Sequence, residues 1–294
     1  ATMPKQWPSG CAVSSPPDPM PDTIDRYAVF GNPIEHSKSP FIHSRFAQQT
    51  GQRLEYTAER VEVDGFDDAV SRFAKNNGKG LNITVPFKQD AWRLATRRSA
   101  RAERAGAVNT LVIDGVDNYY GDNTDGIGLV RDLCNNHGLQ LEGRNILIIG
   151  AGGAVRGVIE PLLECRPALL TIANRTRHKA LQLAEDFSDL GNIRGCGLDE
   201  FGTDEYDIII NGTSASLGGE LPALPATLIS ESTFCYDMMY ATEPTPFMRW
   251  AQQHGAEHVV DGKGMLVEQA AESFRLWRGC EPETAPVIAA LKSL

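Results

Sequence analysis

The sequence has little basic charge, no long apolar run and no closely paired cysteines, and each of these shortages excludes a class of protein. The formal net charge is -10, whereas nonspecific binding to nucleic acid or to an anionic membrane needs a basic surface. No apolar stretch approaches the roughly 20 residues that a membrane helix requires. The six cysteines are scattered and include no C-x-x-C motif, a pattern typical of reduced cytoplasmic thiols.

The sequence also lacks a recognisable metal-binding motif and a secretory signal. His254 and His258 have no acidic or cysteine cluster beside them, so we expect a surface pair and no metal site. Residues 1–24 are rich in proline and poor in aliphatic side chains, and they lack the basic start and apolar core of a secretory signal. We predict a disordered leader there.

What remains is a chain of ordinary globular composition that is long enough for two domains. It has 294 residues, of which 41% are hydrophobic and 22% charged, so it can bury a large core. In the first half, expected strands alternate with helices, which suggests a small α/β domain.

Ser39 is expected to cap a helix whose first residue is Pro40. The other expected elements are strands at 27–30, 54–60 and 81–85, helices over 65–77 and 88–105, and a hairpin over 107–121.

The second half indicates a dinucleotide-binding fold. A continuous aliphatic strand over 145–149 is typical of a parallel strand that is covered on both faces. Gly150 follows it and allows a tight turn, while Gly152 and Gly153 let the backbone approach a pyrophosphate at a helix N-terminus. Such turns also occur for packing alone. Further strands are expected at 169–173, 207–210 and 234–237, with helices up to about 165, over 177–187, 266–278 and 284–294.

The end of the second strand of this half distinguishes between two cofactors. An NAD site would place an acidic side chain there, but the residues are Asn174-Arg175-Thr176, followed by Lys179. A guanidinium can stack on adenine and bind a 2′-phosphate with its forked donors. A capped helix start with solvated basic residues is the alternative, and we expect NADP.

A serine pair in the first half predicts a site for an anion. Ser37 and Ser39 lie at the expected start of a helix, where backbone amides and the helix dipole favour a carboxylate. Plain capping by Ser39, without any ligand, explains the pattern equally well.

Other polar residues of the first half predict a catalytic pair and a binding site for a polyhydroxylated small molecule. Asn82 and Thr84 share one face of an expected strand. Lys88 lies just beyond the end of that strand, where the sites of α/β folds usually open. Asn109 and Asp125 add an amide and a carboxylate from other segments. A lysine and an aspartate that meet in a cleft can transfer protons.

These segments resemble the shikimate dehydrogenase family, in its bacterial NADP-dependent type, from about Tyr27 to the end of the chain. The matching strings follow one another in the order of that family: Y-A-V-F-G-N-P-I-E-H-S-K-S-P, N-I-T-V-P-F-K, A-G-A-V-N-T, D-N-T-D-G, G-A-G-G-A, A-N-R-T, Y-D-M-M-Y and D-G-K-G-M-L-V-E-Q-A. Together they are far more specific than the glycine-rich turn alone.

The resemblance implies the reversible NADPH-dependent reduction of 3-dehydroshikimate to shikimate, a step of aromatic amino-acid biosynthesis. It implies that Lys88 and Asp125 are the catalytic pair. The implied substrate-binding residues are Ser37, Ser39, Asn82, Thr84, Asn109, Tyr240 and Gln269. The implied cofactor-binding residues are Gly150, Ala151, Gly152, Gly153, Ala154, Asn174, Arg175, Thr176, Lys179, Thr213, Met238, Gly262 and Met265.

Three positions depart from what is common in the family, and none of them is in the catalytic pair. Val155 stands where a small serine is common and could tilt the glycine loop, Gly212 replaces a common alanine, and Lys179 replaces a frequent arginine. Two rival functions stay open: a quinate/shikimate dehydrogenase that accepts NAD, and a ligand-sensing homologue without turnover.

The expected architecture is two α/β domains that flank a cleft, the second of them a Rossmann-like doubly wound parallel sheet. We expect residues 25–124 plus 267–294 to bind substrate and residues 125–266 to bind NADP. The expected protein is a cytoplasmic monomer or homodimer that binds neither nucleic acid nor membranes.

Overall fold

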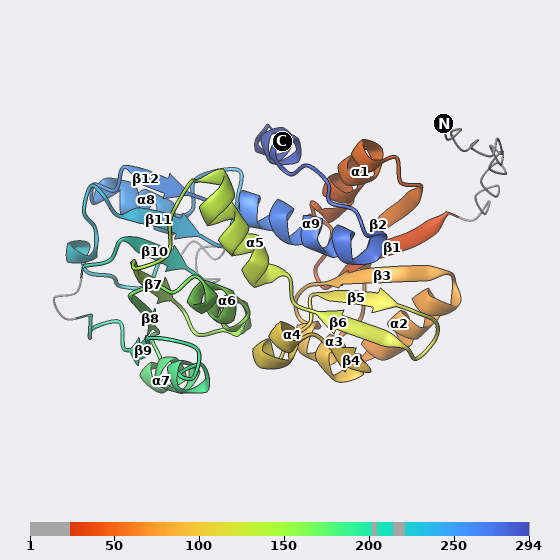
Figure 1. Ribbon diagram of the computed structural model, residues 1–294, viewed down its shortest axis with the longest axis horizontal. Coiled ribbons are helices and arrows are strands. Elements are labelled where there is room, and N and C mark those ends of the chain that lie inside the picture. Colours follow the sequence, from red (N-terminus) through yellow and green to blue (C-terminus); the bar gives the residue numbers. More distant parts are fainter. Residues whose placement is uncertain (1–23, 202–204, 214–220, 294) are drawn as a thin grey trace, which may run out of the picture.

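The computed structural model describes residues 24–201, 205–213 and 221–293 and contains two six-stranded sheets, one toward each end of the molecule (Figure 1). The predicted leader over 1–24 lies outside the described residues, apart from Ile24. Within the described residues, no helix is long and apolar enough to cross a membrane.

The first sheet is mixed, with the strand order β2-β1-β3-β5-β6-β4. Strand β1 alternates between two cores, because Ala28 and Phe30 pack against helices on one face while Tyr27 and Val29 pack toward Trp277 on the other. The strands are β1 (Asp25–Gly31), β2 (Leu54–Arg60), β3 (Gly78–Ile83), β4 (Arg97–Arg98), β5 (Thr110–Ile113) and β6 (Tyr119–Asp122). The helices of this part are α1 (Ser39–Thr50), α2 (Phe66–Lys75), α3 (Lys88–Leu94) and α4 (Ala100–Ala105), with a 3-10 turn η1 (Val63–Gly65).

Two predictions for this half need correction. Helix α1 begins at Ser39, with Lys38 at its N-cap, and the Ser39 amide donates to Ser37 Oγ at 3.3 Å. The prediction that Ser39 caps the helix was therefore wrong, because Ser37 accepts from the helix instead. The expected helix over 88–105 is interrupted by β4, and Ser99 then caps α4 by accepting from the Ala102 amide.

The second sheet is parallel throughout, as the sequence predicted, with the order β12-β11-β10-β7-β8-β9. Ile146 and Ile148 of β7 face one core and Leu147 and Ile149 face another, so both faces are covered. The strands are β7 (Asn145–Ile149), β8 (Leu169–Ala173), β9 (Ile193–Cys196), β10 (Ile208–Asn211), β11 (Phe234–Asp237) and β12 (His258–Val260). The helices are α6 (Gly153–Glu164), α7 (Arg177–Asp186) and α8 (Pro246–Gln253), with a 3-10 turn η4 (Ala226–Leu228).

Two helices lie side by side between the sheets (Figure 1). Helix α5 (Asp125–Arg131) leaves the first sheet and continues into a π-helical turn, η2 (Asp132–Asn136), while α9 (Lys263–Arg278) returns from the second half. Helix α10 (Ala285–Lys292) packs with α9 and α1 through side chains such as Ile42, Phe274 and Val287. The C-terminal helices thus pack back on the first half, as predicted. The residue boundaries predicted for the two domains stay a prediction.

Candidate active site

A cavity of about 460 Å³ lies between the two halves of the molecule. Residues at the end of β3, in the loop after β11 and at the start of α9 line it. Every side chain predicted to bind substrate or to act in catalysis lines it: Ser37, Ser39, Asn82, Thr84, Lys88, Asn109, Asp125, Tyr240 and Gln269.

Lys88 and Asp125 meet in this cavity from two different helices. Each is the first residue of its helix, α3 and α5 respectively. Lys88 Nζ donates to Asp125 Oδ2 at 2.5 Å, and the side chains are 26% and 12% exposed. Asn109 Nδ2 donates to the other carboxylate oxygen, Oδ1, at 2.8 Å. Both oxygens of Asp125 therefore have donors, which fixes the carboxylate and leaves further N–H groups of the ammonium for a ligand.

The amide of Asn109 is itself fixed by its neighbours. Its Oδ1 accepts from the Thr124 amide at 2.9 Å, and its Nδ2 lies 3.3 Å from Gln269 Oε1. Thr110 Oγ1 also donates to Asn109 Oδ1, at 2.9 Å, and lies 2.8 Å from Ser273 Oγ. Thr110, Thr124 and Ser273 are fully buried. Sequence reasoning missed these hydroxyls as part of the site, although Thr110 and Thr124 belong to two of the strings that carry the resemblance.

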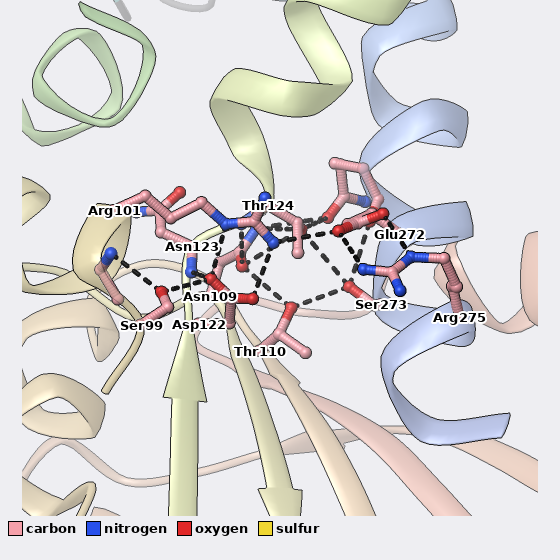
Figure 2. A network of polar contacts seen from close by, with 12 residues as sticks. Ser99, Arg101, Asn109, Thr110, Asp122, Asn123, Thr124, Glu272, Ser273 and Arg275 are labelled. Atoms are coloured by element: carbon pink, nitrogen blue, oxygen red, sulfur yellow. Dashed lines mark hydrogen bonds and ion pairs between the residues drawn. The ribbon is translucent and has the colours of Figure 1, made fainter. Parts of the chain in front are cut away.

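A charged cluster lies beside these hydroxyls and joins the two halves of the chain (Figure 2). Arg101 holds Asp122 with two bonds of 2.7 Å and reaches Glu272 at 3.1 Å. Arg131 and Arg275 also contact Glu272, at 3.0 and 2.8 Å. Burial alone would raise the pKa of Glu272, but the bonds from Arg275 and Arg101 and the charge of Arg131 outweigh it and lower that pKa to about 2. Sequence reasoning did not find this cluster.

The serine pair and Tyr240 occupy another part of the cavity wall. Ser37 Oγ accepts from the Ser39 amide, so its own hydrogen stays available for a ligand. Tyr240 comes from the loop after β11, and burial raises the pKa of its hydroxyl. Neutral hydroxyl donors at the start of α1 suit a carboxylate.

A second cavity, of about 630 Å³, follows the glycine loop. Gly150 has a φ of 114°, which only glycine adopts readily. A Cβ added to Gly152 or Gly153 would meet no atom within 4 Å, so a ligand can approach the backbone there, at the N-terminus of α6. Open backbone at a helix N-terminus fits a pyrophosphate. The other lining residues include Val85, Ala151, Ala154, His178 and Lys179.

The other residues predicted to bind the cofactor do not all line the cavity at the glycine loop. Met238, Gly262 and Met265 line the first cavity. Arg175 and Lys179 are exposed at the start of α7, and within the described residues no ion pair engages either of them. Among the described residues, Gly150, Asn174, Arg175, Thr176 and Thr213 do not line either cavity.

Two departures from the family pattern compensate each other. Val155 is fully buried at the start of α6, and a Cβ added to Gly212 would lie 2.4 Å from Val155 Cγ2. The missing methyl group at position 212 therefore makes the room that the larger side chain at position 155 occupies.

Three family models match the chain in sequence order. They are described as the shikimate dehydrogenase substrate binding domain, over residues 29–111, shikimate / quinate 5-dehydrogenase, over residues 132–218, and the shikimate 5'-dehydrogenase C-terminal domain, over residues 262–292.

Curated relatives and solved structures agree with these matches. A shikimate dehydrogenase (NADP(+)) of Alkalilimnicola ehrlichii is 59% identical over 91% of this chain and 98% of its own length. An Ael1 enzyme from Pseudomonas putida is 47% identical, with a TM-score of 0.86 over 91% of this chain and 98% of its own. A Thermus thermophilus shikimate 5-dehydrogenase, solved with NADP(H) and shikimate, is 31% identical, with a TM-score of 0.81 over 92% of this chain and 99% of its own. The chain therefore belongs to the shikimate dehydrogenase family.

Proposed function

We propose that this chain reduces 3-dehydroshikimate to shikimate with NADPH, and that Lys88 and Asp125 are its catalytic pair. The observation that carries the proposal is that Lys88 and Ala154 line both cavities. The ammonium and the end of the glycine loop thus stand where the space for a polyhydroxylated substrate meets the space for a dinucleotide. A hydride donor and a carbonyl acceptor must meet at such a point.

The lysine supplies the proton that the reduction requires. NADPH, when bound, supplies the hydride that reduces the ring ketone. Lys88 Nζ then gives a proton to the alkoxide oxygen that develops, and its positive charge stabilises that oxygen before transfer. Asp125 accepts from Lys88 and from Asn109 and aims the ammonium. The lysine recovers its proton from solvent.

We assign the other residues that line the first cavity to the groups of the substrate that match their chemistry. Ser37, Ser39 and Tyr240 offer hydroxyl groups to the carboxylate. Amide and hydroxyl side chains are assigned to the ring hydroxyls, since they both donate and accept; they are Asn82, Thr84, Asn109 and Gln269, together with Asp125.

The cofactor is assigned to the second half of the chain, residues 125–266, and the substrate to residues 25–124 plus 267–294. The glycine loop, residues 150–154, would hold the pyrophosphate at the start of α6. Asn174, Arg175, Thr176 and Lys179 would bind the 2′-phosphate, and Thr213, Met238, Gly262 and Met265 would lie near the cofactor. We further propose a cytoplasmic monomer or homodimer that does not bind nucleic acid.

Steady-state kinetics with shikimate and quinate, each with NADP and with NAD, test the proposal. We expect the highest kcat/KM with shikimate and NADP. Preference for NAD, or comparable turnover of quinate, would favour a broader quinate/shikimate dehydrogenase. Binding of shikimate without turnover in any combination would favour a ligand-sensing homologue and contradict the proposal.

A further inference from the structure

His43 is a fully buried histidine beside the cavity of about 460 Å³. The proposed mechanism does not use this residue. It lies on α1 and is 0% exposed. Its ring stacks on that of Tyr56, with centroids 4.2 Å apart and planes 9° from parallel. Both side chains reach the same atom, Asn82 Oδ1: His43 Nε2 lies 3.1 Å from it and the Tyr56 hydroxyl donates to it at 2.7 Å.

The contacts of the Asn82 side chain determine which way its amide points. Its Nδ2 lies 3.4 Å from the backbone carbonyl of Asn109, which can only accept. Nδ2 also donates to Ser273 Oγ at 3.0 Å, and the hydrogen of that hydroxyl is directed to the carbonyl of Gln269 at 3.1 Å. The amide nitrogen therefore faces these acceptors, and Oδ1 must face His43 and Tyr56.

This orientation of Asn82 also fixes the state of His43. Because Oδ1 accepts, the imidazole proton must be on Nε2. Among the described residues, His43 Nδ1 is buried with no hydrogen-bond partner, and the rings of Phe46, Phe274 and Trp277 surround the imidazole. Burial lowers the pKa of His43 to about 3, against the opposing hydrogen bond to Asn82. The ring is therefore a neutral donor at physiological pH.

Tyr56 links the same arrangement to the serine pair. Burial raises the pKa of Tyr56 well above its usual value, and a hydrogen bond with the Ser39 side chain opposes that effect. Ser39 and Asn82 line the cavity, whereas His43 and Tyr56 do not appear among its lining residues. The two rings can thus influence a ligand only through the side chains that they hold.

We propose that His43, together with Tyr56, is a positioning residue: their two donors hold the amide oxygen of Asn82 and so keep its N–H groups on the Asn109 carbonyl and on the hydroxyls of Thr110 and Ser273, at the wall of the cavity. The inference rests on the proposed function, in which Asn82 contacts a ring hydroxyl. Without the His43 donor the amide loses one of the bonds that fix it. Asn82 and the groups that it contacts then lose their fixed positions at the wall of the cavity, and the site fits the ring hydroxyls of the substrate less well.

Two substitutions of His43 separate the hydrogen bond from the packing. His43→Phe keeps a planar ring but removes the donor, whereas His43→Gln places an amide N–H near the position of Nε2. For His43→Phe we expect the KM for shikimate to rise about tenfold, the loss typical of one misdirected hydrogen bond. Its kcat and its KM for NADP should change less than about threefold. His43→Gln should restore a KM close to that of the wild type, which a purely structural role does not predict.

Three outcomes would overturn the inference: a folded His43→Phe variant with the wild-type KM, equal losses in the two variants, or a loss confined to kcat. If His43→Phe does not fold, Tyr56→Phe removes the other donor and keeps its ring, and the same split between the two KM values is expected. The wild-type enzyme is assayed in parallel. Its failure to turn over shikimate would count against the proposed function, whereas normal wild-type turnover with unaffected variants would count against the role of His43 alone.

Discussion

Val155 and Gly212 are two unusual residues that fit only together. A Cβ at position 212 would lie only 2.4 Å from Cγ2 of the buried Val155 side chain. Gly212→Ala should therefore lower the free energy of unfolding by about 1–3 kcal/mol, the usual cost of overpacking a core. Urea unfolding at equilibrium measures this loss.

The double variant tests whether the two positions are coupled. Val155→Ala removes the methyl groups that the new Cβ would meet, so Gly212→Ala should cost much less in that background. A double-mutant cycle would then give a favourable coupling of about 1 kcal/mol or more. Additive effects would show that Gly212 is small for another reason.

The sequence predicted side chains that line the cavity of about 460 Å³, but it did not predict the residues that orient them. Asn82, Lys88 and Asp125 stand at strand ends or helix starts, where polar side chains have a recognisable pattern. His43 and Ser273 lie on helices among apolar neighbours, and nothing in their spacing indicates which amide or hydroxyl they contact. Their partners are set by long-range packing, which a single sequence does not report.

Helix α5 lies so close to α9 that one of its glycines has no room for a side chain. A Cβ added to Gly128 would lie 2.7 Å from Gln269 Cβ and 2.8 Å from the Gln269 amide nitrogen. Because a backbone atom cannot move aside as a side chain can, Gly128→Ala should push α9 away and displace Gln269.

We expect Gly128→Ala to raise the KM for shikimate by several-fold and to lower the free energy of unfolding by about 1–3 kcal/mol. Gly65→Ala is the matched control, since a Cβ there would meet only Glu62 Cβ, at 3.9 Å. An unchanged KM in a Gly128→Ala variant would mean that the position of Gln269 does not depend on the contact between α5 and α9.

The prediction about cofactor choice concerns Arg175, which lies just before the start of α7. Arg175 is exposed there and makes no ion pair within the described residues, whereas Arg177 bonds to Glu200 at 2.7 Å. Arg175→Ala should raise the KM for NADP about 10- to 100-fold and the KM for NAD far less, because a charge-assisted bond to phosphate contributes about 1.5–3 kcal/mol. Arg177→Ala serves as the control and should leave both constants nearly unchanged. Equal losses with both cofactors in Arg175→Ala would remove this residue from the phosphate site.

Strands were easier to predict than the helix that joins the two halves. The bounds of β2, β7, β8 and β11 agree with the sequence predictions, because their apolar residues either alternate or run without interruption between turn residues. Helix α5 was missed, since it begins Asp125-Gly126-Ile127-Gly128 and glycine is a poor helix former. Its glycines serve close contacts with Gln269 and with the Gly157 carbonyl, which local propensity does not show.

Glu272 connects segments that are far apart in the chain. Arg101 and Arg275 contact it (Figure 2), and Arg131 contacts it as well. Its side chain is only 2% exposed. Glu272→Gln should lower the free energy of unfolding by about 1.5–3 kcal/mol, because three guanidinium groups lose their bonds to a buried carboxylate. Glu142→Gln is the control: it breaks an ion pair with Arg166 whose side chains are 67% and 78% exposed, and should cost less than about 1 kcal/mol.

The same carboxylate should make stability depend on pH. The folded pKa of Glu272 is about 2, below its ordinary value of 4.5, so the unfolded chain binds the proton more readily. This contribution is fully present above about pH 4.5 and is lost as the pH falls toward about 2. Between about pH 5 and pH 3, wild-type protein should therefore lose more stability than Glu272→Gln in urea titrations. Parallel losses in both proteins would contradict the assignment.

The most direct test of the whole account is the turnover of Lys88→Ala with shikimate and NADP. Lys88 is the group placed to carry the proton, so the variant should lose more than nine-tenths of kcat while its KM for shikimate stays within about threefold of the wild type. Lys79→Ala, an exposed lysine on the strand that leads to Lys88, controls for the loss of a positive charge and should keep full activity. Retention of more than about a tenth of the wild-type kcat in Lys88→Ala would contradict the assignment of Lys88 and Asp125 as the catalytic pair.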